Sequence, residues 1–436
     1  MISIHMKSLY RRYSQCVNQR LVQNTGQVSY STSMIRLIDN WSAPNQLVKL
    51  FNRLEKMGKA TMICSHGYSQ VTASTTYQVV LNLLLCFWCY LISFRFLLLA
   101  FLRDEKMRII LGDTFIGYQA HSLLNVIFFG ASFLLTSVKT SLAYSESQHQ
   151  MQIMTVFYNL RETWFNPVHH GLTDEDDMNF RRITCLAGLS LNLFINLSCG
   201  SIFILQIQSI LLNPCFSLRT AFLQFLWLPF IDVTMFFSGY ACYWFFIHII
   251  IIISLSIQST NSAIVRVLHL LKPKPYSVSL EKLIYLQNAH YNTISMMNNN
   301  FALPIFISFF VGSFFADLTF FCGTYIGTRN FLIDILLALL GFLIFATIIE
   351  YNLFASKSCH KIETFRKSIH RLLISTRFDL RIMLKVTRTL ERMSTDRIGF
   401  YVGNLFRLDG YHSIVFLLEN VSLYLLLIAN ISRKSL

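Results

Sequence analysis

The feature that most constrains this chain is a series of seven apolar stretches, each long enough to cross a lipid bilayer. A membrane-spanning helix needs about 20 mostly apolar residues, because the hydrocarbon core is roughly 30 Å thick. The stretches are residues 77–102, 115–138, 183–211, 221–257, 301–322, 331–353 and 409–431. Charged residues make up only 14% of the chain, whereas soluble proteins carry about a quarter. The sequence therefore predicts an all-α integral membrane protein with seven transmembrane helices.

Lysine and arginine are distributed unevenly among the segments that connect these stretches. Of the 37 such residues, 28 lie in segments on the same side as the N-terminus, 7 lie on the other side, and 2 lie near the ends of stretches. Positive residues stay preferentially in the cytoplasm, so this bias predicts a cytoplasmic N-terminus and an extracellular C-terminus. The net charge of +15 then belongs to a cytoplasmic surface that faces anionic lipid. No nucleic-acid partner is needed to explain it.

The fourth stretch is too long for a single perpendicular crossing. At 1.5 Å per residue, a helix over 221–257 would extend well past the hydrocarbon core. It must tilt, kink near Pro229 or project into the cytoplasm, and we favour projection. A basic amphipathic segment, residues 362–393, follows the sixth stretch. It is expected either to lie on the inner leaflet or, as we favour, to pack with the projecting helix into a cytoplasmic layer where subunits meet.

These features divide the chain into four parts. Residues 1–76 form a cytoplasmic N-terminal segment, residues 77–353 hold transmembrane helices 1–6 with their loops, residues 354–408 form the basic cytoplasmic helical segment, and residues 409–436 form the last helix and a short extracellular tail. The first 76 residues contain no early apolar core, so we expect no secretory signal.

Sequence motifs for catalysis and metal binding are missing. We find no HExxH pair, P-loop, nucleophile elbow or histidine-box series, so we expect no enzyme, no cofactor and no metal site. The acidic run 174–177 has ligands for a divalent ion, but we favour a solvated loop. The three asparagines at 298–300 are expected to form a polar turn before the fifth stretch. Cys215 and Cys322 would both lie near the outer face, and we favour two unpaired thiols over a disulfide.

The last stretch carries polar residues at membrane depth. On a helix, His412, Glu419 and Asn430 fall on one stripe, and Asn420 lies on the neighbouring stripe. Polar residues inside a membrane usually face a cavity or a pore. Several copies of this helix around an axis would place Glu419 carboxylates along a path for cations, with leucines able to gate it by dewetting. The alternative is that Glu419 pairs with a lysine or arginine of a neighbouring helix.

A family resemblance lies in the same region. Residues 405–409 read Leu-Phe-Arg-Leu-Asp, and fifteen positions later Tyr424 precedes five apolar residues, Asn430 and Ile431. This pattern resembles the C-terminal signature of arthropod gustatory receptors, which reads Thr-Tyr, five hydrophobic residues, Gln-Phe. Only Tyr424 matches outright, because Leu423 replaces the threonine, and Asn430 and Ile431 replace the last two residues. The seven stretches, the inward N-terminus and the long basic inner segment also resemble this family and its odorant-receptor relatives.

The resemblance implies a chemosensory receptor that acts as a ligand-gated, non-selective cation channel in the plasma membrane of sensory neurons. It also implies a homo- or heterotetramer with related receptors, in which cytoplasmic helical extensions hold the subunits together and the last helix lines the pore. By the resemblance and the polar stripe, the pore and gate residues are Glu419, Leu423, Tyr424, Leu427, Asn430 and Ile431. The expected partners are a small organic tastant or odorant, permeating cations and membrane lipid.

The same resemblance places ligand binding in the outer half of each subunit's helical bundle. With the predicted orientation, the aromatic and polar residues available there are Tyr118, His121, Trp227, Asp232, Asp317, Phe320 and Asp334. Aromatic walls with a few polar groups suit a small organic ligand. Each aromatic residue is also explained by contact with lipid or its interface. The aspartates are stronger candidates, because acidic groups at membrane depth are costly, although pairing with lysine or arginine would account for any of them.

Two other functions remain open at this stage. A seven-span receptor would signal through a cytoplasmic partner bound at residues 362–393. A G-protein-coupled receptor would be expected to carry an acidic-Arg-Tyr triplet after the third stretch and an Asn-Pro-x-x-Tyr motif in the last one. This chain has neither motif at these places. A transporter would use Asp232, Asp317 and Asp334 along a proton or substrate route.

Overall fold

Long helices make up most of the fold, and seven of those in the described residues are long and apolar enough to span a membrane. They are α4 (Thr76–Phe101), α6 (His121–Ser147), α8 (Asp174–Leu211), α9 (Leu218–Leu270), α10 (Ser277–Phe321), α11 (Phe331–Ser375) and α13 (Gly410–Ser432). Each predicted stretch lies largely within one of them, so the all-α fold with seven transmembrane helices is confirmed. The orientation of the termini stays a prediction. The computed structural model describes residues 44–64, 67–68, 76–118, 120–148, 151–162, 170–213, 216–270, 277–328, 330–395, 398–403 and 405–432.

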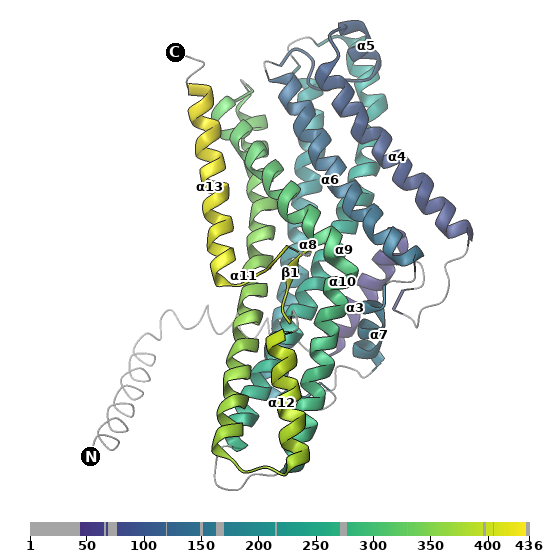
Figure 1. The fold of residues 1–436 in the computed structure, drawn as a ribbon. Coiled ribbons are helices and arrows are strands. Elements are labelled where there is room, and N and C mark those ends of the chain that lie inside the picture. Colours follow the sequence, from purple (N-terminus) through teal and green to yellow (C-terminus); the bar gives the residue numbers. More distant parts are fainter. Residues whose placement is uncertain are drawn as a thin grey trace, which may run out of the picture.

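Shorter elements precede or connect the seven long helices. They are α3 (Pro44–Ala60), α5 (Glu105–Ile110), α7 (Ile153–Glu162), the π-helical turn η1 (Cys322–Ile326), α12 (Leu380–Thr395), β1 (Tyr401–Val402) and β2 (Phe406–Arg407). The two strands form an antiparallel hairpin between α12 and α13, with Tyr401 opposite Arg407. Figure 1 shows α13 along one edge of the bundle and α4 along the opposite edge.

Helix α9 is the centre of the bundle. It packs against α4, α6, α8, α10 and α11, and Trp244, Phe245 and the five isoleucines at 249–253 are at most 1% exposed. A helix segment that is apolar on all sides lies in a protein core or in a membrane, and this part of α9 lies in the protein core. The helix continues through Pro229 to Leu270, so the excess length of the fourth stretch is a helical extension beyond the membrane-spanning part.

This extension of α9 packs against the far half of α11. The hydroxyls of Ser256 and Ser358 hydrogen-bond at 2.9 Å, and Lys361 Nζ donates to Asn261 Oδ1 at 2.8 Å. Apolar residues of the basic segment are buried there, namely Ile362, Phe365, Ile369 and Leu372. The structure therefore shows a helical layer, in which α12 also packs against α10 and α11 (Figure 1). Its cytoplasmic location and its contacts with other subunits stay predictions.

The acidic run 174–177 is not a loop, and that expectation is wrong. It forms the first turn of α8, where the Thr173 side chain caps the helix. Asp176 is 3% exposed, and its carboxylate accepts hydrogen bonds from Asn261 at 2.8 Å and Ser262 at 2.5 Å. Acidic side chains are favoured in a first helical turn because they offset the exposed backbone N–H groups. The run therefore ties α8 to α9.

The asparagines at 298–300 do not form a turn either, because α10 runs through them. Asn298 Nδ2 donates to Gly399 O at 2.6 Å, and the Asn298 side-chain oxygen accepts from the Tyr401 N–H at 3.4 Å. Asn300 Oδ1 accepts from the Ile153 N–H at 3.1 Å. These amides hold the β-hairpin and the start of α7 against α10, which explains why polar residues occur within this helix.

The cysteines of the described part of the chain are free thiols, and most are buried. Cys322 is one of the buried ones, at the start of η1. Cys215 lies outside the described residues, so the pairing of these two cysteines is not tested.

Candidate functional site

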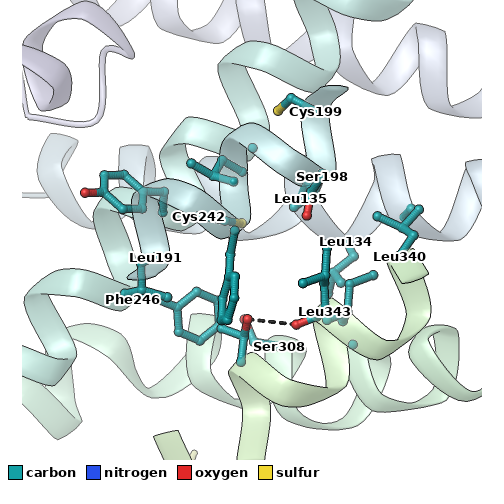
Figure 2. Close-up of a pocket in the computed structure, with 18 of the residues that line it drawn as sticks. Leu134, Leu135, Leu191, Ser198, Cys199, Cys242, Phe246, Ser308, Leu340 and Leu343 are labelled. Carbon is teal, nitrogen blue, oxygen red and sulfur yellow. Dashed lines mark hydrogen bonds between the residues drawn. The ribbon is translucent and has the colours of Figure 1, made fainter. Parts of the chain in front are cut away.

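An apolar cavity lies where five of the long helices meet. Its volume is about 140 Å³, and its walls come from α6, α8, α9, α10 and α11. The larger side chains that line it are Leu134, Leu135, Leu191, Phe194, Ile195, Ile202, Met235, Tyr243, Phe246, Leu340, Leu343, Ile344 and Ile348. Figure 2 shows Leu134, Leu191, Phe246 and Leu343 around this space. Cavities of about 150 Å³ with such walls hold benzene, so this one accommodates a small aromatic or aliphatic molecule.

The cavity exists because small residues line parts of its walls. A Cβ added at Gly239 would lie 3.2 Å from Ile195 Cδ1 and 3.6 Å from Cys199 Sγ. A Cβ added at Gly312 would lie 3.3 Å from Ile348 Cδ1. The other small lining residues are Ala131, Ser198, Cys242 and Ser308. Longer side chains at these positions would take up the space, so the size of the cavity depends on them.

The cavity walls offer few polar groups, and among the described residues no charged side chain lines them. The Tyr243 hydroxyl donates to Gly188 O at 3.1 Å, and the Thr347 hydroxyl donates to Leu343 O at 2.9 Å. Both hydroxyls are therefore already engaged with backbone carbonyls. A ligand here would bind mainly by burying apolar surface, at roughly 25 cal/mol per Å².

Three of the predicted ligand residues, Tyr118, His121 and Trp227, lie at the α5 end of the bundle and do not line the cavity. The Tyr118 hydroxyl donates to a carbonyl at the end of α8 at 3.2 Å. His121 is the first residue of α6 and hydrogen-bonds the adjacent serine. Trp227 on α9 donates to a carbonyl at the end of α5 at 3.2 Å, and the Arg95 guanidinium lies 4.7 Å from its ring centroid. The contacts of Tyr118 and Trp227 tie the connecting segments to the bundle.

A buried ion pair that sequence analysis missed holds the same end together. Arg108 Nη2 lies 2.6 Å from Asp113 Oδ2, and Asp113 is 0% exposed. The Asp113 carboxylate also accepts hydrogen bonds from the Phe115 N–H at 3.0 Å and from Asn125 at 3.1 Å. Gln224 of α9 donates to the Asp113 carbonyl at 2.6 Å. The segment after α5 is therefore fixed against α6 and α9.

The other four predicted ligand residues also lie outside the cavity. Asp232 on α9 lines a groove beside it. Asp317 on α10 is 9% exposed, and its Oδ2 atom has no hydrogen-bond partner among the described residues. Asp334 accepts a hydrogen bond from a loop N–H at 2.7 Å. The ring of Phe320 lies 5.6 Å from that of Tyr424. Ligand binding by these seven residues stays a prediction.

Helix α13 packs one face against α10 and α11. Phe416 is 6% exposed, and its ring centroid lies 4.1 Å from that of Phe309. Asn420 is buried and donates to the Phe416 carbonyl at 2.7 Å. The hydroxyl of Tyr424 hydrogen-bonds that of Thr324, in η1, at 3.0 Å. Of the predicted gate residues, Tyr424 therefore contacts its own subunit.

The opposite face of α13 is exposed in the described part of the chain. Glu419 and Asn430 are exposed. Their apolar neighbours Leu418, Val421, Leu425 and Leu426 are 54–61% exposed. Leu423 and Leu427 are half-buried, and the side chain of Ile431 lies outside the described residues. A carboxylate on a membrane helix is costly in lipid, so this face requires water or another protein surface; the pore assignments stay predictions.

The cavity residues on α9 carry a sequence signal that was not used. Met235, Gly239, Cys242 and Phe246 recur every three or four residues, which places them on one helix face. The residues predicted to bind ligand are aromatic and polar, whereas this face combines small and apolar ones. Small residues at helical spacing let membrane helices approach closely, and this pattern also permits a cavity where the approach is incomplete.

The fold resembles that of solved insect olfactory receptors. The structure of the insect olfactory receptor OR5 from Machilis hrabei in complex with eugenol matches with a TM-score of 0.65 at 11% sequence identity, covering 88% of this chain and 99% of that chain. Another structure of OR5 from Machilis hrabei matches with a TM-score of 0.64 at 12% identity, covering 88% and 98%. No protein-family model and no curated protein sequence matches the chain. The likeness shows a shared seven-helix membrane fold.

Proposed function

We propose that this chain is a subunit of a ligand-gated cation channel of the insect chemoreceptor type. A small apolar molecule would bind in the cavity and shift α13, which opens a path for cations. One observation carries the proposal: the cavity shares α10 and α11 with α13, since both helices line the cavity and both pack against α13. A ligand that prefers one spacing of these helices would change the position of α13.

The contacts of Phe416 supply the coupling between cavity and α13. Its ring lies 4.1 Å from Phe309 on α10 and 6.5 Å from Phe345 on α11. Each of these two residues follows a cavity-lining residue in the sequence, Ser308 and Ile344. A change in the separation of α10 and α11 at the cavity would therefore reach Phe416 without an intermediate side chain.

The exposed face of α13 is the proposed pore surface. In a tetramer, four copies of this face would enclose a water-filled path along the central axis. Glu419 would then face water, which removes the cost of a carboxylate in lipid. The Tyr424 motif favours the gustatory branch, with assembly as a homo- or heterotetramer in the plasma membrane of sensory neurons. The ligand would then be a tastant or odorant. A channel of this kind needs no catalytic group, and we assign none.

Cation current in cells that express the chain tests the proposal. Small apolar molecules should evoke current, and Gly312→Val should raise the half-maximal ligand concentration about tenfold, because filling a packed space costs about 1–3 kcal/mol. Ala289→Val is the matched control, since it enlarges an exposed side chain of the same helix that does not line the cavity. Unchanged responses in Gly312→Val at normal surface levels would contradict ligand binding in the cavity.

The predicted orientation has its own test. Epitope tags before Met1 and after Leu436 would be probed with antibodies on intact and permeabilised cells. A hidden N-terminal tag and a visible C-terminal tag are expected. The reverse pattern would contradict the charge bias and favour a receptor that signals through a cytoplasmic partner.

A further inference from the structure

A groove between α8 and α9 adjoins the cavity. It has a volume of about 500 Å³ and opens on the outer surface of the bundle. Cys199, Ile202 and Met235 line both the groove and the cavity. In the described part of the chain, the two spaces therefore share wall side chains from α8 and α9. A molecule bound in the groove is in position to extend into the cavity.

Asp232 is the charged residue of this otherwise apolar groove. The residues around it include Phe203, Val233, Phe236 and Phe237. Among the described residues, no side chain forms an ion pair or a hydrogen bond with the half-buried Asp232 carboxylate. A carboxylate in apolar surroundings at membrane depth is costly unless a cation pairs with it. The protein itself supplies no such cation in the described part of the chain.

The positions along α9 define the length of a molecule that would use both spaces. Asp232, Met235 and Gly239 follow one face of the helix in steps of three and four residues. Asp232 and Gly239 are seven residues apart, which corresponds to about 10 Å along the axis. An apolar body of that length would place one end beside Asp232 and the other in the cavity beside Gly239.

We propose that the groove and the cavity form one binding site for small apolar amines, with the ammonium group paired to Asp232 and the apolar end in the cavity. The inference rests on the proposed function in taking the cavity as the ligand site, and it adds the chemical class of the ligand. A primary alkylamine is positively charged at neutral pH, as a lysine side chain with a pKa of about 10.4 is. Its ammonium group donates charge-assisted hydrogen bonds to a carboxylate. A neutral molecule of the same shape leaves Asp232 unpaired.

A matched pair of compounds tests this assignment. 4-Phenylbutylamine and 4-phenylbutan-1-ol have the same phenyl group and chain, and differ in the charged amine and the neutral hydroxyl. Binding to the full-length protein in nanodiscs of uncharged lipid would be followed as the ligand-dependent rise in melting temperature. The amine should bind at least about tenfold more tightly than the alcohol, because charge-assisted hydrogen bonds are roughly twice as strong as those between neutral groups.

Three variants identify the group responsible for the preference. Asp232→Asn should weaken the amine to the level of the alcohol and leave the alcohol unchanged. Glu350→Gln is the matched control, because it removes another half-buried carboxylate of a membrane-spanning stretch that lines neither space, and it should keep the preference. Gly200→Leu leaves Asp232 in place and projects a side chain from the groove wall into open space. It should weaken the amine at least tenfold even if Asp232→Asn does not fold.

The outcomes separate this inference from the proposed function. Equal binding of the two compounds to the unaltered protein, binding of neither, an amine preference that survives Asp232→Asn, or unchanged amine binding in Gly200→Leu would overturn the amine site. An amine preference that disappears in Asp232→Asn, together with no amine-evoked cation current in the unaltered protein, would leave the amine site intact and contradict the channel. Cation current evoked by neutral compounds, with no preference for the amine, would support the channel and contradict the amine site.

Discussion

Helices α9 and α13 are both apolar enough to span a membrane, yet their surroundings are opposite. In the most apolar part of α9, 89% of the residues are buried, whereas only 17% are buried in the most apolar part of α13. Helix α9 packs against five other long helices, whereas α13 packs against α10 and α11 (Figure 1). Hydropathy identifies both as membrane helices but does not distinguish sides that meet protein from sides that meet lipid or water. The weakly held helix is the one suited to move.

The largest effect is expected in the core around α9. Trp244 is 0% exposed, and its indole N–H donates to Leu54 O of α3 at 3.1 Å. Trp244→Ala should destabilise the protein by about 3–5 kcal/mol, because it leaves a cavity and removes this hydrogen bond. The measurement is the melting temperature of the purified protein, with Leu91→Ala as control, since Leu91 on α4 is 48% exposed. Equal shifts in the two variants would contradict the central role of α9.

A smaller, local effect is expected on the buried face of α13. Phe416→Ala should cost about 3 kcal/mol, and the loss should be confined to the docking of α13. Hydrogen exchange followed by mass spectrometry should then accelerate in α13 and stay slow in α9. Leu418→Ala, on the exposed face, is the matched control and should change neither helix. Equal acceleration in α9 would show that the two helices unfold as one unit.

The N-terminal cap of α13 should contribute less. Asp409 Oδ1 accepts from the His412 N–H at 3.0 Å, three positions on, as an N-cap side chain does. Asp409→Ala should cost about 1 kcal/mol and Asp409→Asn much less, because asparagine keeps a capping oxygen. Exchange rates in the first turn of α13 would report both. Equal effects of the two variants would assign the role of Asp409 to its charge.

The smallest effect on a single subunit is expected on the exposed face of α13. Leu418→Ser and Val421→Ser should each change the stability of one subunit by less than about 0.5 kcal/mol, because both side chains are more than half exposed. If neighbouring subunits cover this face, the same variants should lower the fraction of tetramer measured by mass photometry. An unchanged tetramer fraction would place this face against lipid or water alone.

The sequence predicts the membrane helices well because hydropathy measures transfer into a bilayer. The first stretch, 77–102, differs from α4 by one residue at each end, and the sixth begins with α11 at Phe331. Hydropathy does not report helix beyond the bilayer. Helices α8, α9, α10 and α11 continue through polar residues outside the apolar stretches, and for that reason hydropathy does not identify the acidic run and the asparagines as helical.

The candidate site is less predictable because it depends on helix rotation. Residues from five distant stretches line the cavity, and a single sequence does not specify which face of each helix points inward. Residue type alone favours polar and aromatic residues as ligand contacts. In the structure, however, Tyr118 and Trp227 donate hydrogen bonds to backbone carbonyls of connecting segments. The cavity instead lies where residues such as Gly239 and Gly312 leave space.

The central claim is that the exposed face of α13 lines a cation path, and Glu419 is its most direct test. The measurement is the reversal potential of the ligand-evoked current under a sodium chloride gradient, in cells that express the unaltered chain or Glu419→Lys at equal surface levels. The account predicts a current that reverses near the sodium potential and shifts towards the chloride potential in Glu419→Lys, since the sign of a charged ring sets ion preference. An identical reversal potential in the two proteins would contradict a pore lined by this face of α13.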